Sequence, residues 1–267
     1  MSQVSIGEGS RLVRRAGGVV SRAGIVLARG GGVLLTALLV ASPSHAKHDE
    51  LPRCSLQSAN GTRCTVAVKD LRPTQFAVGM REVREKAERI ARMTKAERTK
   101  FLSRKPEPIV IAPGGLLYIT DHHHLARALL DQDVKDTYAV VEDNLAGDAD
   151  FWGTMKSRHW VDLCGADGKG PHSPEELPTS VAGLADDPYR SLAGAVDDAG
   201  GFRKSDAPFV EFRWANFLRT RVPIGASFQQ AVKAGIEVAH SKDACGLPGY
   251  AGAATECPTK DDPGTCL

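Results

Sequence analysis

Three consecutive histidines follow an acid in the stretch YITDHHHLARALL, residues 118–130. An imidazole has a reference pKa of about 6.5, so it can accept or donate a proton near neutral pH. A protonated imidazole can also stabilise an anionic transition state, and Asp121 can orient a neighbouring ring. These residue types in this order are therefore candidates for acid–base chemistry on an anionic substrate.

The histidines are predicted to occupy the first turn of a helix that follows a strand. LLYIT, residues 116–120, has the pattern of a strand, and Leu125, Ala128 and Leu129 recur at helical spacing. Asp121 stands immediately before this pattern and is the predicted N-cap. First-turn amides lack intrahelical acceptors, and the helix dipole favours anions there. Such a helix start suits an anion-binding site.

Two other interpretations of the motif remain open. Successive residues of a helix point about 100° apart, so His122, His123 and His124 cannot all face one metal ion. No metal ligand is assigned, although a divalent metal held by Asp121 or a remote residue as well is an alternative. The other alternative is a capped helix with one buried and two exposed histidines.

The segment before the motif is predicted to supply the rest of a small α+β domain. Residues 65–70 read as a strand, residues 71–75 as the turn after it, and residues 79–93 as a helix. TKAE, residues 94–97, is a capping box that starts a second short helix. PIVIA, residues 108–112, is a strand whose hairpin partner is LLYIT.

The later region of the chain is predicted to be helical. A stretch rich in Gly, Pro and Ser, residues 165–180, reads as a long loop. Aromatic residues at helical spacing in residues 207–222 indicate a helix with a buried face, and residues 227–244 indicate another. We expect the two helices to form a hairpin that covers the α/β part. Glu211 and Arg213 are candidates to approach the motif helix.

Residues 1–46 have the composition of an export signal peptide. Five arginines precede the apolar run GGGVLLTALLVA, and Ser44 and Ala46 take the small-residue positions before the predicted cleavage point. The run is too short for a comfortable membrane span, so no span is expected after cleavage. An uncleaved interfacial anchor is the alternative. The expected location is periplasmic or secreted.

All six cysteines lie beyond residue 46, and an even number in an exported chain favours disulfides. Spacing favours the near pairs Cys54–Cys64 and Cys257–Cys266, which would leave Cys164 for Cys245. No CxxC occurs, so a zinc site built from cysteines is not expected.

The charge balance gives little support to an extended nucleic-acid surface. The chain has 34 basic and 32 acidic residues, and residues 1–46 hold five of the basic and one of the acidic ones. The remainder is therefore slightly acidic, whereas proteins that neutralise phosphate backbones concentrate Lys and Arg. The basic stretch at residues 81–105 is most simply the solvated side of a helix.

The order of these motifs resembles a known family. RPTQ at residues 72–75, then a helix, a strand, a Gly-rich turn and YITDHHHLARAL, resembles the ParB-like nuclease group of the ParB/sulfiredoxin superfamily. The later FVEFRWANFLR and LPGY resemble the helical extension of exported ParB-like proteins. The resemblance implies an α+β fold, with a small mixed sheet of ParB/sulfiredoxin type and a C-terminal helical extension. It divides the chain after the signal peptide into a lead-in with a disulfide (47–63), an α/β domain (64–147), the extension (148–245) and a cysteine-containing tail (246–267).

The superfamily pattern at the helix start is D-G-H-H-R. The acid falls on Asp121 and the paired histidines on His123 and His124, but His122 takes the glycine position and Leu125 the arginine position. In the family that arginine and the helix N-terminus hold phosphates, so these departures argue against tight nucleotide binding. Sulfiredoxins need a cysteine where His123 stands, so their chemistry is not expected here. An exported protein also has no expected role in chromosome partition.

The function that the resemblance leaves is phosphoester hydrolysis at the start of the motif helix. His123 is the predicted general acid or base, His124 assists it or binds phosphate, and Asp121 caps the helix and orients an imidazole. The substrate-binding candidates are Arg72, Thr74, Gln75 and His122. The expected partner is a small phosphorylated ligand or nucleic acid, while the cofactor and the oligomeric state stay open. The alternative is a non-catalytic ligand- or protein-binding module of the cell envelope.

Overall fold

The computed structural model describes residues 51–253, 257 and 266. The predicted signal peptide and most of the C-terminal tail lie outside these described residues. The described residues all belong to one compact unit. Within the described stretches of the chain, no helix combines the length and the apolar character needed to cross a membrane.

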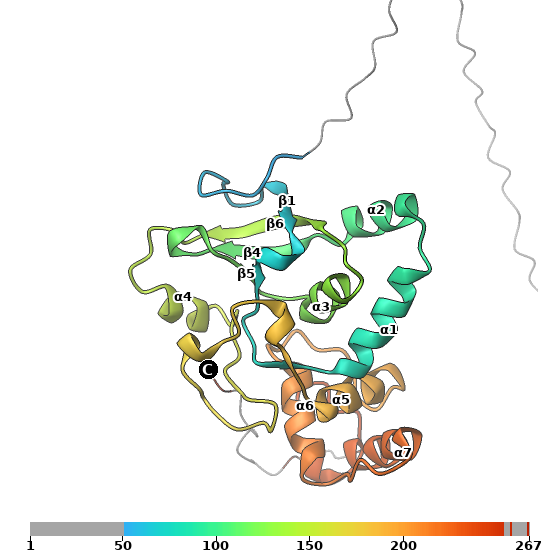
Figure 1. The fold of residues 1–267 in the computed structure, drawn as a ribbon. Coiled ribbons are helices and arrows are strands. Elements are labelled where there is room, and N and C mark those ends of the chain that lie inside the picture. Colours follow the sequence, from blue (N-terminus) through green and yellow to red (C-terminus); the bar gives the residue numbers. More distant parts are fainter. Residues whose placement is uncertain (1–50, 254–256, 258–265, 267) are drawn as a thin grey trace, which may run out of the picture. The chain divides into compact units, whose positions relative to one another are not determined.

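A five-stranded mixed sheet forms the centre of the α/β part (Figure 1). Its strands, in sheet order, are β1 (Arg63–Ala67), β6 (Asp136–Asn144), β4 (Glu107–Ile111), β5 (Leu117–Ile119) and β2 (Leu71–Arg72). β4 and β5 are antiparallel, as the predicted hairpin requires, whereas β4 and β6 are parallel. The α+β fold with a small mixed sheet is confirmed.

Two local predictions for this sheet are wrong. The strand expected over residues 65–70 ends at Ala67, because residues 68–70 turn into the short 3-10 helix η1 (Val68–Asp70). The turn expected over residues 71–75 begins as a strand, since Leu71 and Arg72 pair with β5. The other 3-10 helices are η2 (Pro113–Gly115), η3 (Pro174–Glu176), η4 (Val181–Gly183) and η5 (Lys242–Ala244).

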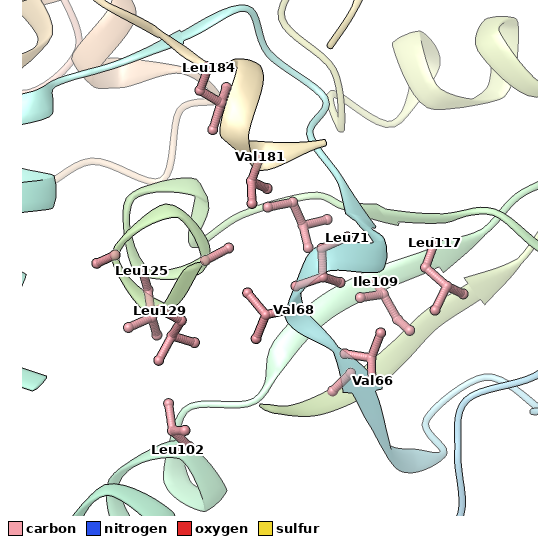
Figure 2. Close-up of a cluster of buried hydrophobic side chains, with 14 of the residues drawn as sticks. Val66, Val68, Leu71, Leu102, Ile109, Leu117, Leu125, Leu129, Val181 and Leu184 are labelled. Carbon is pink, nitrogen blue, oxygen red and sulfur yellow. The ribbon is translucent and has the colours of Figure 1, made fainter. Parts of the chain in front are cut away.

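Helices cover both faces of the sheet because successive strand residues point to opposite sides. Ile109 and Ile111 of β4 face α1 (Met80–Ala91) and α3 (His123–Asp131), where Leu125 and Leu129 complete the cluster drawn in Figure 2. Val110, between those isoleucines, packs instead with α4 (Phe151–Ser157). The predicted helix at 79–93 is confirmed as α1, and the Thr94–Glu97 capping box begins α2 (Lys95–Arg104).

The C-terminal helices pack around one that the sequence did not predict. α6 (Val210–Arg219) and α7 (Phe228–Ala239) both pack against α5 (Pro188–Asp198). Trp214 is fully buried in their common core. The prediction that an α6–α7 hairpin covers the α/β part is therefore wrong. Helix α5 of the extension packs against α1 instead. The helical extension also contacts the α/β part through a parallel strand pair, β3 (Ala77–Val78) with β7 (Ala185–Asp186).

All six cysteines form disulfides. The Cys54–Cys64 bond is confirmed, but the other two predicted pairs are wrong, because Cys164 bonds Cys266 and Cys245 bonds Cys257. The carbonyl of Cys266 accepts a hydrogen bond from Leu163 N, which brings the end of the chain to residue 164. Three disulfides are compatible with an oxidising compartment.

Candidate functional site

A cavity of about 620 Å³ lies at the N-terminus of the motif helix, α3. Its lining combines residues of the α/β part with residues of α5 and α6. Five of the predicted site residues line it: Gln75, Asp121, His122, His123 and His124. Thr74 and Arg72 are not among its lining residues. The RPTQ segment and the motif therefore meet, but only Gln75 of that segment reaches the cavity.

His123 is used to hold the RPTQ segment. Its side chain is only 5% exposed, and its Nε2 accepts a hydrogen bond of 3.0 Å from the backbone N–H of Thr74. Thr74 in turn donates its hydroxyl to the carbonyl of Ile119 at 2.8 Å. Burial lowers the pKa of His123 to about 3. The ring is therefore neutral at neutral pH, and the nitrogen that would take a proton already has a donor.

His124 has a similar role at the beginning of α1. Its Nε2 accepts from the backbone N–H of Gly79, the N-cap of α1, at 3.1 Å. Burial lowers the pKa of this imidazole to about 3. The carboxylate of Glu82 lies 3.3 Å from the same nitrogen, but because the ring is neutral this contact is not an ion pair at neutral pH.

His122 differs from its neighbours in both backbone and side chain. Its φ of 62° and ψ of 20° are left-handed, a conformation that costs a non-glycine residue about 1–2 kcal/mol. Helix α3 begins after it, so His122 is the N-cap and the predicted Asp121 cap is wrong. The Asp121 carboxylate instead accepts from the N–H of His122 at 2.6 Å. Strain of this kind persists where the surroundings impose it and gathers at functional sites.

The surroundings of His122 include a buried carboxylate. Glu107, the first residue of β4, is 0% exposed, and neither of its oxygens has a hydrogen-bond partner among the described residues. Its Oε2 lies 3.5 Å from Nδ1 of His122, a charge contact rather than a well-formed hydrogen bond. Nδ1 of His122 is buried and lies against Glu107, and His122 is one of the residues that line the cavity. Nε2 is therefore the ring nitrogen that Glu107 does not occupy.

Glu107 and His122 titrate as a pair. Desolvation raises the pKa of Glu107 to about 7, and contact with Glu107 raises the pKa of His122. The two pKa values are coupled, because the buried carboxylate and the imidazole beside it favour each other's charged form. A carboxylate that orients one imidazole nitrogen and stabilises the imidazolium is the arrangement in which the other nitrogen serves as a general base.

A cationic group reaches the same cavity from the helical extension. Arg190 of α5 is 4% exposed, lines the cavity and pairs through Nη2 with Oε2 of Glu211 at 2.6 Å. Glu211 thus approaches the motif helix as expected from the sequence, while Arg213 is not among the cavity's lining residues. Glu107 and Arg190 were not predicted as site residues.

A metal site has little support in this geometry. In the described ranges, no group of three or more His, Cys, Asp or Glu side chains is placed to hold a metal ion. The Nε2 atoms of His123 and His124 accept backbone N–H bonds, which would compete with metal ligation. A divalent metal held by Asp121 or a remote residue stays an untested alternative.

The fold and the motif define the class of protein. A mixed sheet whose hairpin leads into a helix that starts at paired histidines is the arrangement expected of a ParB-like domain, here with a helical extension.

Residues 64–220 match the family described as "Putative ParB-like nuclease", and the chain belongs to this family. The crystal structure of protein Atu1540 from Agrobacterium tumefaciens is similar, with a TM-score of 0.67 and 34% sequence identity. That match covers 72% of this chain and 97% of the other. No curated protein matches this chain.

Proposed function

We propose that this protein is an exported ParB-like phosphoester hydrolase whose proton acceptor is His122, supported by Glu107. The observation that carries the proposal is the buried Glu107 carboxylate, which has no hydrogen-bond partner among the described residues and lies 3.5 Å from a strained histidine on the wall of a cavity. Burying such a carboxylate is costly, and a cost of this kind is expected to serve a function. The three disulfides support the exported location.

In the reaction that we propose, Nε2 of His122 takes a proton from water as the water oxygen attacks phosphorus. The new P–O bond forms while the bond to the leaving oxygen breaks, and that oxygen takes a proton from solvent. Glu107 stabilises the imidazolium that results. The hydrogen bond from Thr74 to His123 favours His122 over His123 as the base, and His123 and His124 then position the cavity wall.

The test is a hydrolysis screen of the disulfide-intact protein. Aryl phosphate monoesters, aryl phosphate diesters, DNA and RNA are assayed with chelator and with added divalent metal. A general base contributes about 10²–10⁴-fold, so His122→Ala should lower turnover by that order, while the exposed His172→Ala should not. Full activity in His122→Ala would refute the assignment of the base. Saturable ligand binding without turnover under every condition would favour the non-catalytic binding module.

A further inference from the structure

Arg190 presents buried hydrogen-bond donors that the described residues do not use. Its Nη2 bonds Glu211, but its Nε and Nη1 are buried and have no hydrogen-bond partner among the residues that the structure describes. The guanidinium also lies 4.4 Å from the centre of the Phe212 ring, which fixes its plane. An arginine cannot lose its proton in a protein, so these donors stay charged at any physiological pH.

Leaving such donors unpaired is expensive. A buried polar group without a partner costs about 1–3 kcal/mol, and more when it is charged. Arg190 lines the cavity, so a ligand bound there lies beside the guanidinium. The planar fork of arginine matches the oxygens of phosphate or carboxylate, which makes an oxyanion the natural partner.

The rest of the cavity limits the kind of anion. Lys86, Arg89 and Lys105 also line it, but so do the acids Glu82, Asp121 and Glu142. A lining with charges of both signs suits one anionic group rather than a chain of phosphates, which would need a continuous basic track. Four aromatic side chains on the same lining offer an apolar wall for the remainder of the ligand: Phe101, Trp160, Phe209 and Phe212.

We infer that Arg190 binds the phosphate group of a small aryl or similarly apolar phosphate monoester. The choice of phosphate over another oxyanion rests on the proposed function, whereas the anion site itself rests on the unpaired donors. The helical extension then supplies the cation that the motif helix lacks at Leu125, where the superfamily pattern has arginine. This gives α5 a role in binding as well as in packing.

The experiment is calorimetric titration of the disulfide-intact protein with inorganic phosphate, sulfate, acetate, phenyl phosphate and a short oligonucleotide. Phosphate should bind, and phenyl phosphate should bind about tenfold more tightly, as one added aromatic contact would give. Arg190→Lys should weaken phosphate binding at least tenfold because it removes the fork. Arg219→Lys is the matched control, since Arg219 makes an equivalent 2.6 Å pair with Asp187 but does not line the cavity.

A second variant keeps the test independent of the stability of Arg190→Lys. Glu211→Gln removes the carboxylate that competes for Nη2, so phosphate should bind several-fold more tightly. Any of four results would overturn the inference. The first two are an absence of phosphate binding by the wild type and unchanged phosphate binding in Arg190→Lys. The other two are a loss of phosphate affinity in Arg219→Lys as large as that in Arg190→Lys, and weaker phosphate binding by Glu211→Gln than by the wild type. Tighter binding of acetate than of phosphate would show a carboxylate site, and tighter binding of the oligonucleotide would show a nucleic-acid site. Either result would also overturn the inference.

These titrations involve no turnover, so the inference and the hydrolase proposal fail separately. Arg190-dependent phosphate binding without hydrolysis refutes only the hydrolase. Hydrolysis that persists in Arg190→Lys, with phosphate binding unchanged, refutes only the role of Arg190.

Discussion

Glu107→Gln should make the protein more stable at alkaline pH and less active. The carboxyl of Glu107 is fully buried, and desolvation raises its pKa from 4.5 to about 7. Glutamine has nearly the same shape and never ionises, so it removes the cost of the buried charge. It also removes the carboxylate that orients and charges His122.

The size of the effect follows from the two pKa values. At about 1.4 kcal/mol for each pH unit between them, ionising Glu107 in the folded protein costs roughly 3 kcal/mol. Below pH 4.5 the carboxyl is protonated in both the folded and the unfolded state, so the cost is absent. Above pH 7 it is ionised in both, and the whole cost applies. The unfolding free energy of the wild type, relative to Glu107→Gln, should therefore fall as the pH rises from 4.5 to 7.

Urea unfolding of both proteins at a series of pH values, with the disulfides intact, measures this difference. The matched control is Glu142→Gln, which makes the same change at an exposed acid on the lining of the same cavity. Relative to Glu142→Gln, the unfolding free energy of the wild type should show no comparable fall with rising pH. A pH-independent difference between wild type and Glu107→Gln would refute the reasoning, because it would mean that Glu107 does not change protonation near pH 7.

Three further perturbations test the site and the fold. His122→Gly should change the unfolding free energy by less than about 1 kcal/mol, because relief of the left-handed backbone offsets the entropy of glycine, yet hydrolysis should fall at least about 10²-fold. His123→Ala leaves the buried N–H of Thr74 without an acceptor and should cost about 1–3 kcal/mol in urea unfolding. Because burial lowers the pKa of His123 to about 3, the wild type loses this advantage as the pH falls from 6.5 toward 3, and a constant gap would contradict the assignment. Replacing Cys164 and Cys266 by serine opens a loop of sequence separation 102 and should cost about 4–5 kcal/mol in the same assay, whereas peptide mapping that joins Cys164 to Cys245 would disprove the pairing.

The elements predicted correctly are those with local signals. The capping box at Thr94 specifies its own helix start, and the two short apolar runs PIVIA and LLYIT, separated by the turn PGG, specify the hairpin. Helix α1 likewise follows from the spacing of its apolar residues. Each of these signals is complete within a few residues of sequence.

The errors occur where distant segments decide the outcome. Spacing selected two wrong disulfides because the contact between Leu163 and Cys266 joins segments far apart in the chain, and local sequence carries no signal for it. Helix α5 did have local signals, since Asp187 caps it and Pro188 occupies its first turn. Its apolar residues are mostly smaller than the aromatic ones of α6, although α5 is the helix on which α6 packs.

The candidate site was only partly predictable for the same reason. The DHHH motif marked the helix start, but Glu107 lies in a different strand, and an acid at the beginning of an apolar strand is normally exposed. Only packing against α3 makes it the buried partner of His122. Arg190 belongs to the extension, and its unpaired donors depend on how α5 lies against the motif helix.

The three adjacent histidines can now be explained by the directions in which they point. Residues about 100° apart around a helix start cannot share one ligand, and here each histidine has a different partner. His123 accepts from Thr74 and His124 from Gly79, so together they hold the segment that joins β2 to α1. His122 lies outside the helix and turns back to Glu107 in β4. Two imidazoles are thus occupied by backbone amides at their Nε2 atoms, so in the mechanism that we propose the third, in the strained conformation, is the one that exchanges a proton with a ligand in the cavity.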